Sequence, residues 1–139
     1  MDQTRPLIAV LDDETQFCKA LARLLKSYNF EVVTYTHGEE FLKSCALRLP
    51  HCLLLDLHMP EINGFEVLDR IARKHLPVIV ITGHDSPEAR ARAVAGGVSA
   101  YLRKPVDDQL LLDAIAVAIS KKESAKNQPV KWPATEPEN

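Results

Sequence analysis

The stretch "LLLDLHMPEINGFEVL", residues 53–68, carries the pattern that decides the fold. Its three leucines run directly into Asp56. A short, continuously apolar run is typical of a strand that is buried on both faces of a parallel sheet. Because carboxylates are rarely buried without a partner, we expect Asp56 to end this strand for a functional reason. Apolar residues then recur at helical spacing from Phe65 onward, which predicts a helix after the loop.

Four further segments have the composition of strands. Residues 7–11 (LIAVL) and 78–81 (VIVI) are continuously apolar, like residues 52–55 (CLLL), and these three predict central strands. Residues 31–35 (EVVTY) and 99–104 (SAYLRK) contain more polar side chains. They therefore predict the two edge strands of the same sheet.

Helical patterns alternate with these strands. We expect helices after Asp13, over residues 38–47, from Phe65 to Ala72, from Pro87 to the Gly96-Gly97 pair, and over residues 107–120. Ser86 is the expected N-cap of the fourth helix, with Pro87 in its first position. Five β-α repeats predict an α/β fold, a doubly wound, flavodoxin-like (β/α)5 domain with a five-stranded parallel sheet. Edge-like second and fifth strands favour the order 2-1-3-4-5.

The composition narrows the functional class. The chain has 139 residues, 46% of them hydrophobic and 26% charged, with a formal net charge of -2. A near-neutral balance does not favour direct binding to nucleic acid or to an anionic membrane. No apolar run approaches the roughly 20 residues that span a bilayer, and the first ten residues lack a secretion signal. A cytoplasmic location is therefore expected.

The domain is expected to occupy residues 1–121. Residues 122–139 are poor in apolar side chains and contain three prolines. Such a composition predicts a disordered tail or the start of a linker. Trp132 is the one large apolar side chain in this segment.

Functional side chains follow the predicted strands. In the proposed strand order, Asp12 and Asp13 after the first strand and Asp56 after the third meet where the topology reverses. Three neighbouring carboxylates repel one another, and a hard divalent cation such as Mg²⁺ relieves the repulsion. Thr82 and Lys104 end the fourth and fifth strands at the same edge.

This set of groups suits phosphoryl transfer to an aspartate. A carboxylate can act as the nucleophile, and the reaction depends mainly on positioning and charge neutralisation. Taken singly, the Asp pair and Thr82 could be capping residues and Lys104 a solvated charge. Their joint arrival at one edge favours the chemical interpretation.

The sequence resembles the receiver domains of two-component response regulators. The resemblance rests on "LDDE" (11–14), residues 53–68, "VIVITGH" (78–84) and "AYLRKPV" (100–106), which occur in the family's order. It implies that Asp56 accepts a phosphoryl group from a phosphohistidine of a sensor histidine kinase or histidine phosphotransfer protein.

The resemblance also implies roles for other residues. Asp13, Asp56 and the backbone carbonyl of His58 would ligate Mg²⁺, and Asp12 would hold a coordinated water. Lys104 and Thr82 would contact the acyl phosphate, and the Lys104-Pro105 bond would be cis.

Output follows from the same resemblance. Coupled movement of Thr82 and Tyr101 would remodel the surface formed by the fourth helix, the fifth strand and the fifth helix. A downstream effector or effector domain would read this surface, and phosphorylation could produce a homodimer. His58 and His84 would border the site, and His84 is expected to affect the lifetime of the acyl phosphate.

Three alternatives remain open from the sequence. The domain could be a phosphate sink without output, or a pseudo-receiver that is not phosphorylated, although its full acidic set argues against the latter. A haloacid-dehalogenase-like phosphatase also uses an Asp nucleophile and Mg²⁺, but its DxD motif stands near the first strand. As a receiver, the domain would not turn over an external substrate.

Overall fold

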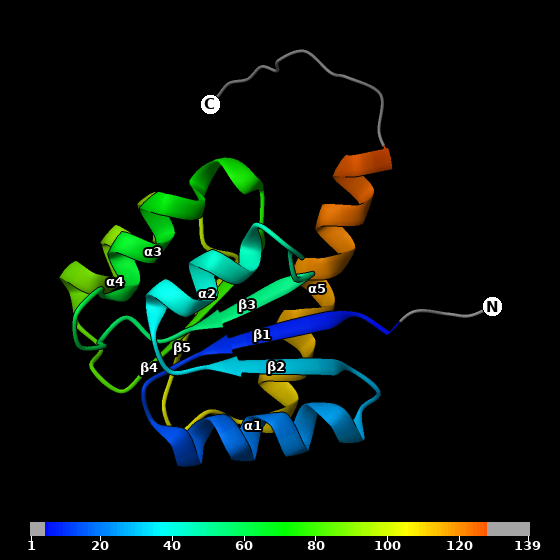
Figure 1. The fold of residues 1–139 in the computed structure, drawn as a ribbon, viewed down its shortest axis with the longest axis horizontal. Helices are drawn as coiled ribbons and strands as arrows, with labels where there is room; N and C mark the ends of the chain where they lie inside the picture. Colours follow the sequence, from blue (N-terminus) through cyan, green and yellow to red (C-terminus); the bar gives the residue numbers. More distant parts are fainter. Residues whose placement is uncertain (1–4, 128–139) are drawn as a thin grey trace.

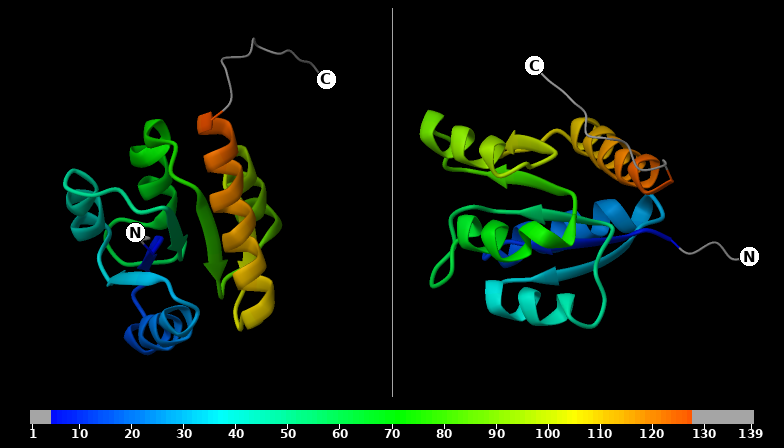
Figure 2. Two further views of the ribbon diagram at one scale, coloured as in Figure 1. Left: turned by 90° about the vertical axis from the view of Figure 1, so that its right-hand side faces the viewer. Right: turned by 90° about the horizontal axis from the view of Figure 1, so that it is seen from above.

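The computed structural model describes residues 5–127, which form a parallel sheet covered by helices on both faces (Figures 1 and 2). The strands are β1 (Leu7–Leu11), β2 (Glu31–Tyr35), β3 (Cys52–Leu55), β4 (Val78–Thr82) and β5 (Ala100–Arg103). Their order in the sheet is β2-β1-β3-β4-β5, which confirms the predicted topology. The arrowheads of β1, β2 and β3, which mark the carboxyl ends, point to the same side in Figure 1.

The register of the strands aligns their carboxyl ends. Leu11 of β1 pairs with Tyr35 of β2 and with Leu55 of β3. The residues that follow continue the alignment, because the N–H of Asp56 donates to the carbonyl of Leu11 at 3.0 Å. Asp12 and Asp56 therefore leave neighbouring strands at the same level.

The helices are α1 (Thr15–Ser27), α2 (Gly38–Cys45), α3 (Gly64–Ile71), the 3₁₀ turn η1 (Ala72–Lys74), α4 (Pro87–Ala95) and α5 (Asp108–Asn127). The start of α4 is as predicted, since the Ser86 hydroxyl accepts a hydrogen bond from the N–H of Ala89 at 3.0 Å. The chain after α4 turns at Gly97, whose φ of 84° suits glycine.

Two cores lie on opposite faces of the sheet. Ala9 and Leu11 pack with α2, α3 and α4, whereas the alternate residues Ile8 and Val10 pack with α1 and α5. Every residue of β1, β3 and β4, the predicted central strands, is buried. The residues of β2 and β5, the predicted edge strands, are mostly half-buried. The assignment of central and edge strands is thus confirmed.

The last helix is longer than predicted. It continues to Asn127, whereas we expected it to end near Ser120. Residues 121–127 (KKESAKN) are mostly good helix formers, and the first proline comes only at Pro129. The remainder of the predicted tail, with Trp132, lies outside the described residues. No helix within residues 5–127 is long and apolar enough to cross a membrane.

Candidate functional site

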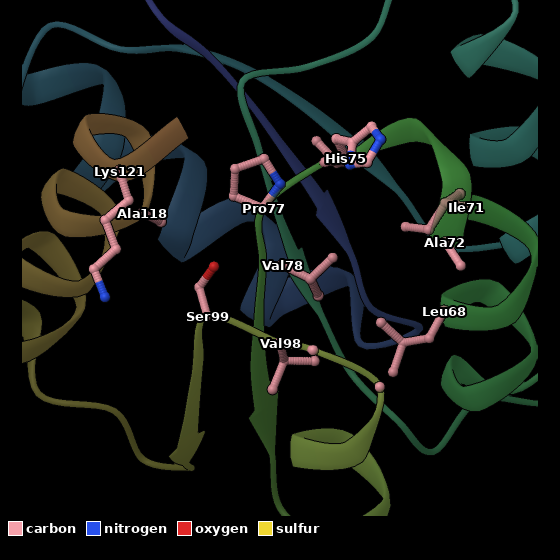
Figure 3. Close-up of a pocket in the computed structure, with 13 residues that line it drawn as sticks. Leu68, Ile71, Ala72, His75, Pro77, Val78, Val98, Ser99, Ala118 and Lys121 are labelled. Atoms are coloured by element: carbon pink, nitrogen blue, oxygen red, sulfur yellow. The ribbon is translucent and has the colours of Figure 1, made fainter. Parts of the chain in front are cut away.

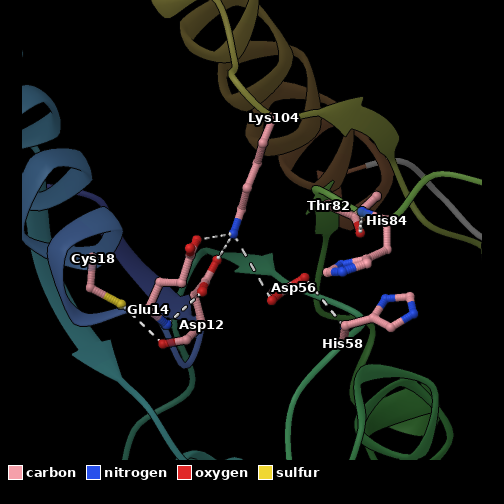
Figure 4. A network of polar contacts seen from close by, with 8 residues as sticks. All are labelled: Asp12, Glu14, Cys18, Asp56, His58, Thr82, His84 and Lys104. Atoms are coloured by element: carbon pink, nitrogen blue, oxygen red, sulfur yellow. Dashed lines mark hydrogen bonds and ion pairs between the residues drawn. The ribbon is translucent and has the colours of Figure 1, made fainter.

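Three carboxylates meet at the carboxyl ends of β1 and β3. One carboxylate oxygen from each of Asp12, Asp13 and Asp56 lies within 4.8 Å of the others. Asp12 is 2% exposed and Asp56 5%, whereas Asp13 is exposed. Backbone groups orient the two buried ones: the N–H of Glu14 donates to Asp12 at 2.9 Å, and the N–H of His58 donates to Asp56 at 3.3 Å (Figure 4).

The cluster is electrostatically unfavourable without a cation. Burial, reinforced by the neighbouring charge of Asp12, raises the pKa of Asp56 to about 6. Burial also raises the pKa of Asp12. In addition, Asp12 Oδ2 is buried, and its close cationic neighbour is the Lys104 ammonium, 2.8 Å away. Three oxygen donors with these properties fit a hard divalent cation such as Mg²⁺.

Lys104 reaches the cluster from the end of β5. Its Nζ atom lies 2.8 Å from Asp12 Oδ2, an ion pair without hydrogen-bond geometry, and 4.0 Å from Asp56 Oδ2. The Lys104-Pro105 peptide is cis, as the family resemblance implied. Burial alone would lower the pKa of Lys104, but the carboxylates of Asp12 and Glu14 beside it leave that pKa raised. The lysine is therefore a charged ammonium at neutral pH.

Thr82 lies at the end of β4 and is fully buried. Its hydroxyl oxygen accepts a hydrogen bond from the N–H of His84 at 3.0 Å. A Cβ on the next residue, Gly83, would stand 3.7 Å from Lys104 Cδ, which is an ordinary contact distance. The sequence prediction therefore placed Thr82 at the correct edge.

Two imidazole rings lie beside Asp56. The rings of His58 and His84 have centroids 4.3 Å apart and are tilted by 34° (Figure 4). A hollow of about 460 Å³ opens next to Asp13 and His58. The sequence marked each histidine as bordering the site, but their contact with each other is visible only in the structure.

Tyr101 is half-buried on β5 and packs against the core that includes α2, α3 and α4. The Arg90 guanidinium lies 4.5 Å from the centre of its ring. Its hydroxyl is buried without a hydrogen-bond partner among the described residues. Burial, followed by the nearby Asp85 carboxylate, raises the pKa of Tyr101. Tyr101 therefore lies between the core and Arg90, with Asp85 near its hydroxyl.

A larger hollow lies at the other end of the sheet. It measures about 820 Å³ and is formed by η1, the residues before β4, the turn after α4, and α5 (Figure 3). Leu68, Ile71 and Val98 make it mainly apolar, and its ionisable lining groups are His75 and Lys121. It contains no carboxylate, so its size does not make it the chemical site.

Two contacts of Lys104 were missed from the sequence. Glu14 Oε1 lies 2.8 Å from Lys104 Nζ, and the ring centre of Phe17 lies 4.3 Å from the same atom. Glu14 belongs to the "LDDE" motif, and its charge beside the Asp pair was the available signal. Phe17 was assigned only to the apolar face of its helix.

The switch-point carboxylates lie at one edge of the sheet with a threonine and a lysine from the next two strands, which is the arrangement expected of a receiver domain. The chain belongs to the response regulator receiver domain family, whose model it matches over residues 8–116. It is 35% identical over 117 residues to nodulation protein W of Bradyrhizobium diazoefficiens, covering 83% of this chain and 52% of that protein.

Two other similarities agree with this assignment. The chain is 31% identical over 137 residues to the DNA-binding transcriptional regulator NtrC of Salmonella typhimurium, covering 95% of this chain but 29% of NtrC. The crystal structure of a response regulator receiver protein from Burkholderia phymatum superposes with a TM-score of 0.77 at 39% identity, covering 84% of this chain and 96% of that one. The chain thus spans about half or less of these two curated relatives, and nearly all of the solved receiver.

Proposed function

We propose that this receiver domain is a phosphorylation-dependent switch in which Asp56 is the phosphoacceptor. The observation that carries the proposal is the meeting of Asp12, Asp13 and Asp56 within 4.8 Å, with the Lys104 ammonium 4.0 Å from Asp56. The donor is a phosphohistidine of a histidine kinase or histidine phosphotransfer protein. An Asp56 oxygen attacks phosphorus, the P–O bond forms as the P–N bond breaks, and the imidazole leaves with the electron pair.

The acidic cluster would hold Mg²⁺ through Asp13, Asp56 and the backbone carbonyl of His58, with Asp12 acting through water. Such an ion, when bound, neutralises the charge of the carboxylates and of the phosphoryl oxygens. Lys104 binds a phosphoryl oxygen as a point charge. The Thr82 hydroxyl donates a hydrogen bond to a second phosphoryl oxygen. Its proton is available because, in the contact with the N–H of His84, the hydroxyl oxygen only accepts.

The switch couples Thr82 to Tyr101. Thr82 moves toward the phosphoryl group, Tyr101 shifts inward, and the α4-β5-α5 surface changes its affinity for an effector, an effector domain or a second copy of the domain. The place of Tyr101 supports this assignment, because its ring is half-buried on β5 and contacts Arg90 of α4. The proposed location is the cytoplasm, and neither nucleic acid nor membrane is a proposed direct partner.

This function is signalling, without turnover of an external substrate. Family membership argues against the dehalogenase-like phosphatase, because the acceptor here follows β3 and not β1. A phosphate sink would share the whole site and differ only in output. The two are separated by testing whether phosphorylation changes the affinity for a partner or for a second copy.

Intact mass after incubation with Mg²⁺ and acetyl phosphate tests the chemistry. The wild-type domain is expected to gain one phosphoryl group that is lost in alkali, and Asp56→Asn is expected to gain none. Asp69→Asn, which removes an exposed carboxylate of α3, is the matched control and is expected to behave like wild type. Equal labelling of Asp56→Asn and wild type would show that the acceptor is another residue.

A further inference from the structure

Lys104 is held away from Asp56 in this structure. Its ammonium lies 2.8 Å from Glu14 Oε1 and 4.0 Å from Asp56 Oδ2 (Figure 4). The same Nζ atom sits over the ring of Phe17, 4.3 Å from its centre. Glu14 is the N-cap residue of α1 and Phe17 lies in its first turn, so one helix start supplies both contacts. To neutralise a phosphoryl group on Asp56, the Lys104 ammonium has to give up at least one of its contacts with Glu14 and Phe17.

We propose that Glu14 is a positioning residue that holds Lys104 on the β1 side before phosphorylation and releases it to the phosphoryl group on Asp56. The inference rests on the proposed function. It gives Glu14 a role outside the acidic cluster, as the competitor of the acyl phosphate for one ammonium.

Asp12 does not account for this effect by itself. Asp12 is buried and belongs to the three-carboxylate cluster, so a cation bound there would share its charge. The side chain of Glu14 is 63% exposed and is not a member of that cluster. Filling the cluster with a cation therefore leaves the bond between Glu14 and Lys104 in place.

The contacts of Lys104 with Phe17 and with Glu14 differ in kind. The ring of Phe17 is half-buried and attracts the ammonium at short range. The bond to Glu14 is solvent-exposed, and exposed ion pairs are weak and screened by salt. A weak bond suits a residue that has to release its partner during each cycle.

Replacing Glu14 with its neutral isostere tests the proposal. At saturating Mg²⁺ and subsaturating acetyl phosphate, Glu14→Gln is expected to take up the phosphoryl group about two to five times faster than wild type, the range that a weak exposed ion pair implies. The gain is expected to shrink as salt is added, because the wild-type bond is then already screened. Glu40→Gln, at an exposed position of α2, is the matched control and is expected to leave the rate unchanged.

The same substitution in a variant without the lysine distinguishes two explanations for a faster rate. One is release of Lys104, and the other is a general loss of negative charge near the site. Lys104→Met is expected to phosphorylate slowly because it lacks the ammonium, and adding Glu14→Gln to it is expected to have no further effect. An equal gain in that background, or an unchanged or slower rate with Lys104 intact, would overturn the role of Glu14. These outcomes leave the proposed function standing as long as the wild type is labelled, whereas a wild type that gains no phosphoryl mass overturns both.

Discussion

The two ends of the sheet are built from the same strands but differ in chemistry. Within residues 5–121, the buried polar or charged residues are Asp12, Asp56 and Thr82, and all three lie at carboxyl ends of strands. At the amino ends, the strands begin with buried apolar residues such as Leu7, Cys52 and Val78, beside a mainly apolar groove. The carboxyl end therefore carries the proposed chemistry at a cost in stability, whereas the amino end carries buried apolar groups that stabilise the fold.

The largest expected effect comes from removing the buried charge of Asp56. Its pKa is raised from 3.8 to about 6, so the folded state binds the proton more tightly than the unfolded state. The stability of the metal-free wild type should therefore fall as pH rises from about 4 to 6 and stay low above that. In EDTA at pH 8, Asp56→Asn is expected to be more stable by up to about 3 kcal/mol.

Urea denaturation across this pH range measures the difference. The gain of Asp56→Asn should shrink as pH falls toward 4 and vanish only well below the unfolded pKa of 3.8, where the wild-type carboxyl is protonated in both states. With saturating Mg²⁺ the difference in the free energy of unfolding between Asp56→Asn and wild type should also become smaller, because the cation stabilises the wild-type site. If the variant were less stable than wild type at pH 8 in EDTA, the carboxyl end would not carry the stability cost assigned to it.

Close packing beneath the site gives the next effect. A Cβ on Gly64 would stand 2.7 Å from the Cα of Leu57 and 2.8 Å from the carbonyl oxygen of Asp56, so the backbone would have to move. Gly64→Ala is expected to lower the free energy of unfolding by about 1 to 3 kcal/mol and to slow phosphorylation. Gly83→Ala at the same edge meets only Lys104 Cδ, at 3.7 Å, and should lose much less stability. Equal losses in the two variants would contradict the steric explanation.

A smaller effect is expected from the histidine pair. The His84 ring contacts that of His58 beside Asp56, and we expect the two rings to limit the access of water to an acyl phosphate on Asp56. His84→Ala should therefore speed the loss of phosphate, by less than about tenfold, since one ring contact contributes less than 1.4 kcal/mol to the barrier. The measurement is the decay of phosphorylated mass after removal of the donor. His37→Ala, at an exposed position, is the control, and an unchanged decay in His84→Ala would exclude the shielding role.

Much of this organisation could be predicted because its signals are local. Apolar runs fixed the five strands to within a residue or two, and the order of edge and central strands followed from their composition. Parallel strands bring their carboxyl ends together, so Asp12, Asp13, Asp56, Thr82 and Lys104 could be placed at one edge without knowledge of side-chain positions.

The contacts that escaped prediction depend on side-chain direction across long sequence separations. Glu14 and Lys104 are 90 residues apart, and nothing near either residue shows that they meet. The same holds for the contact of Arg90 with Tyr101 and for that of His58 with His84. The length of α5 was underestimated for a different reason, because a polar stretch with good helix formers such as lysine, glutamate and alanine continues a helix without an apolar signal.

The smallest effect is expected at the amino end, and it is the sharpest test of the contrast. Ala72 is exposed on η1 and lines the apolar hollow of about 820 Å³ at the amino ends of the strands. An arginine there adds bulk and charge without entering the core. Ala72→Arg should change stability by no more than about 0.5 kcal/mol and leave phosphoryl uptake unchanged. Met59→Arg introduces the same side chain beside the hollow that Asp13 and His58 line, and it should alter uptake because its charge lies near the carboxylates. If both variants changed uptake equally, the groove would be coupled to Asp56, and the two ends of the sheet would not be functionally separate.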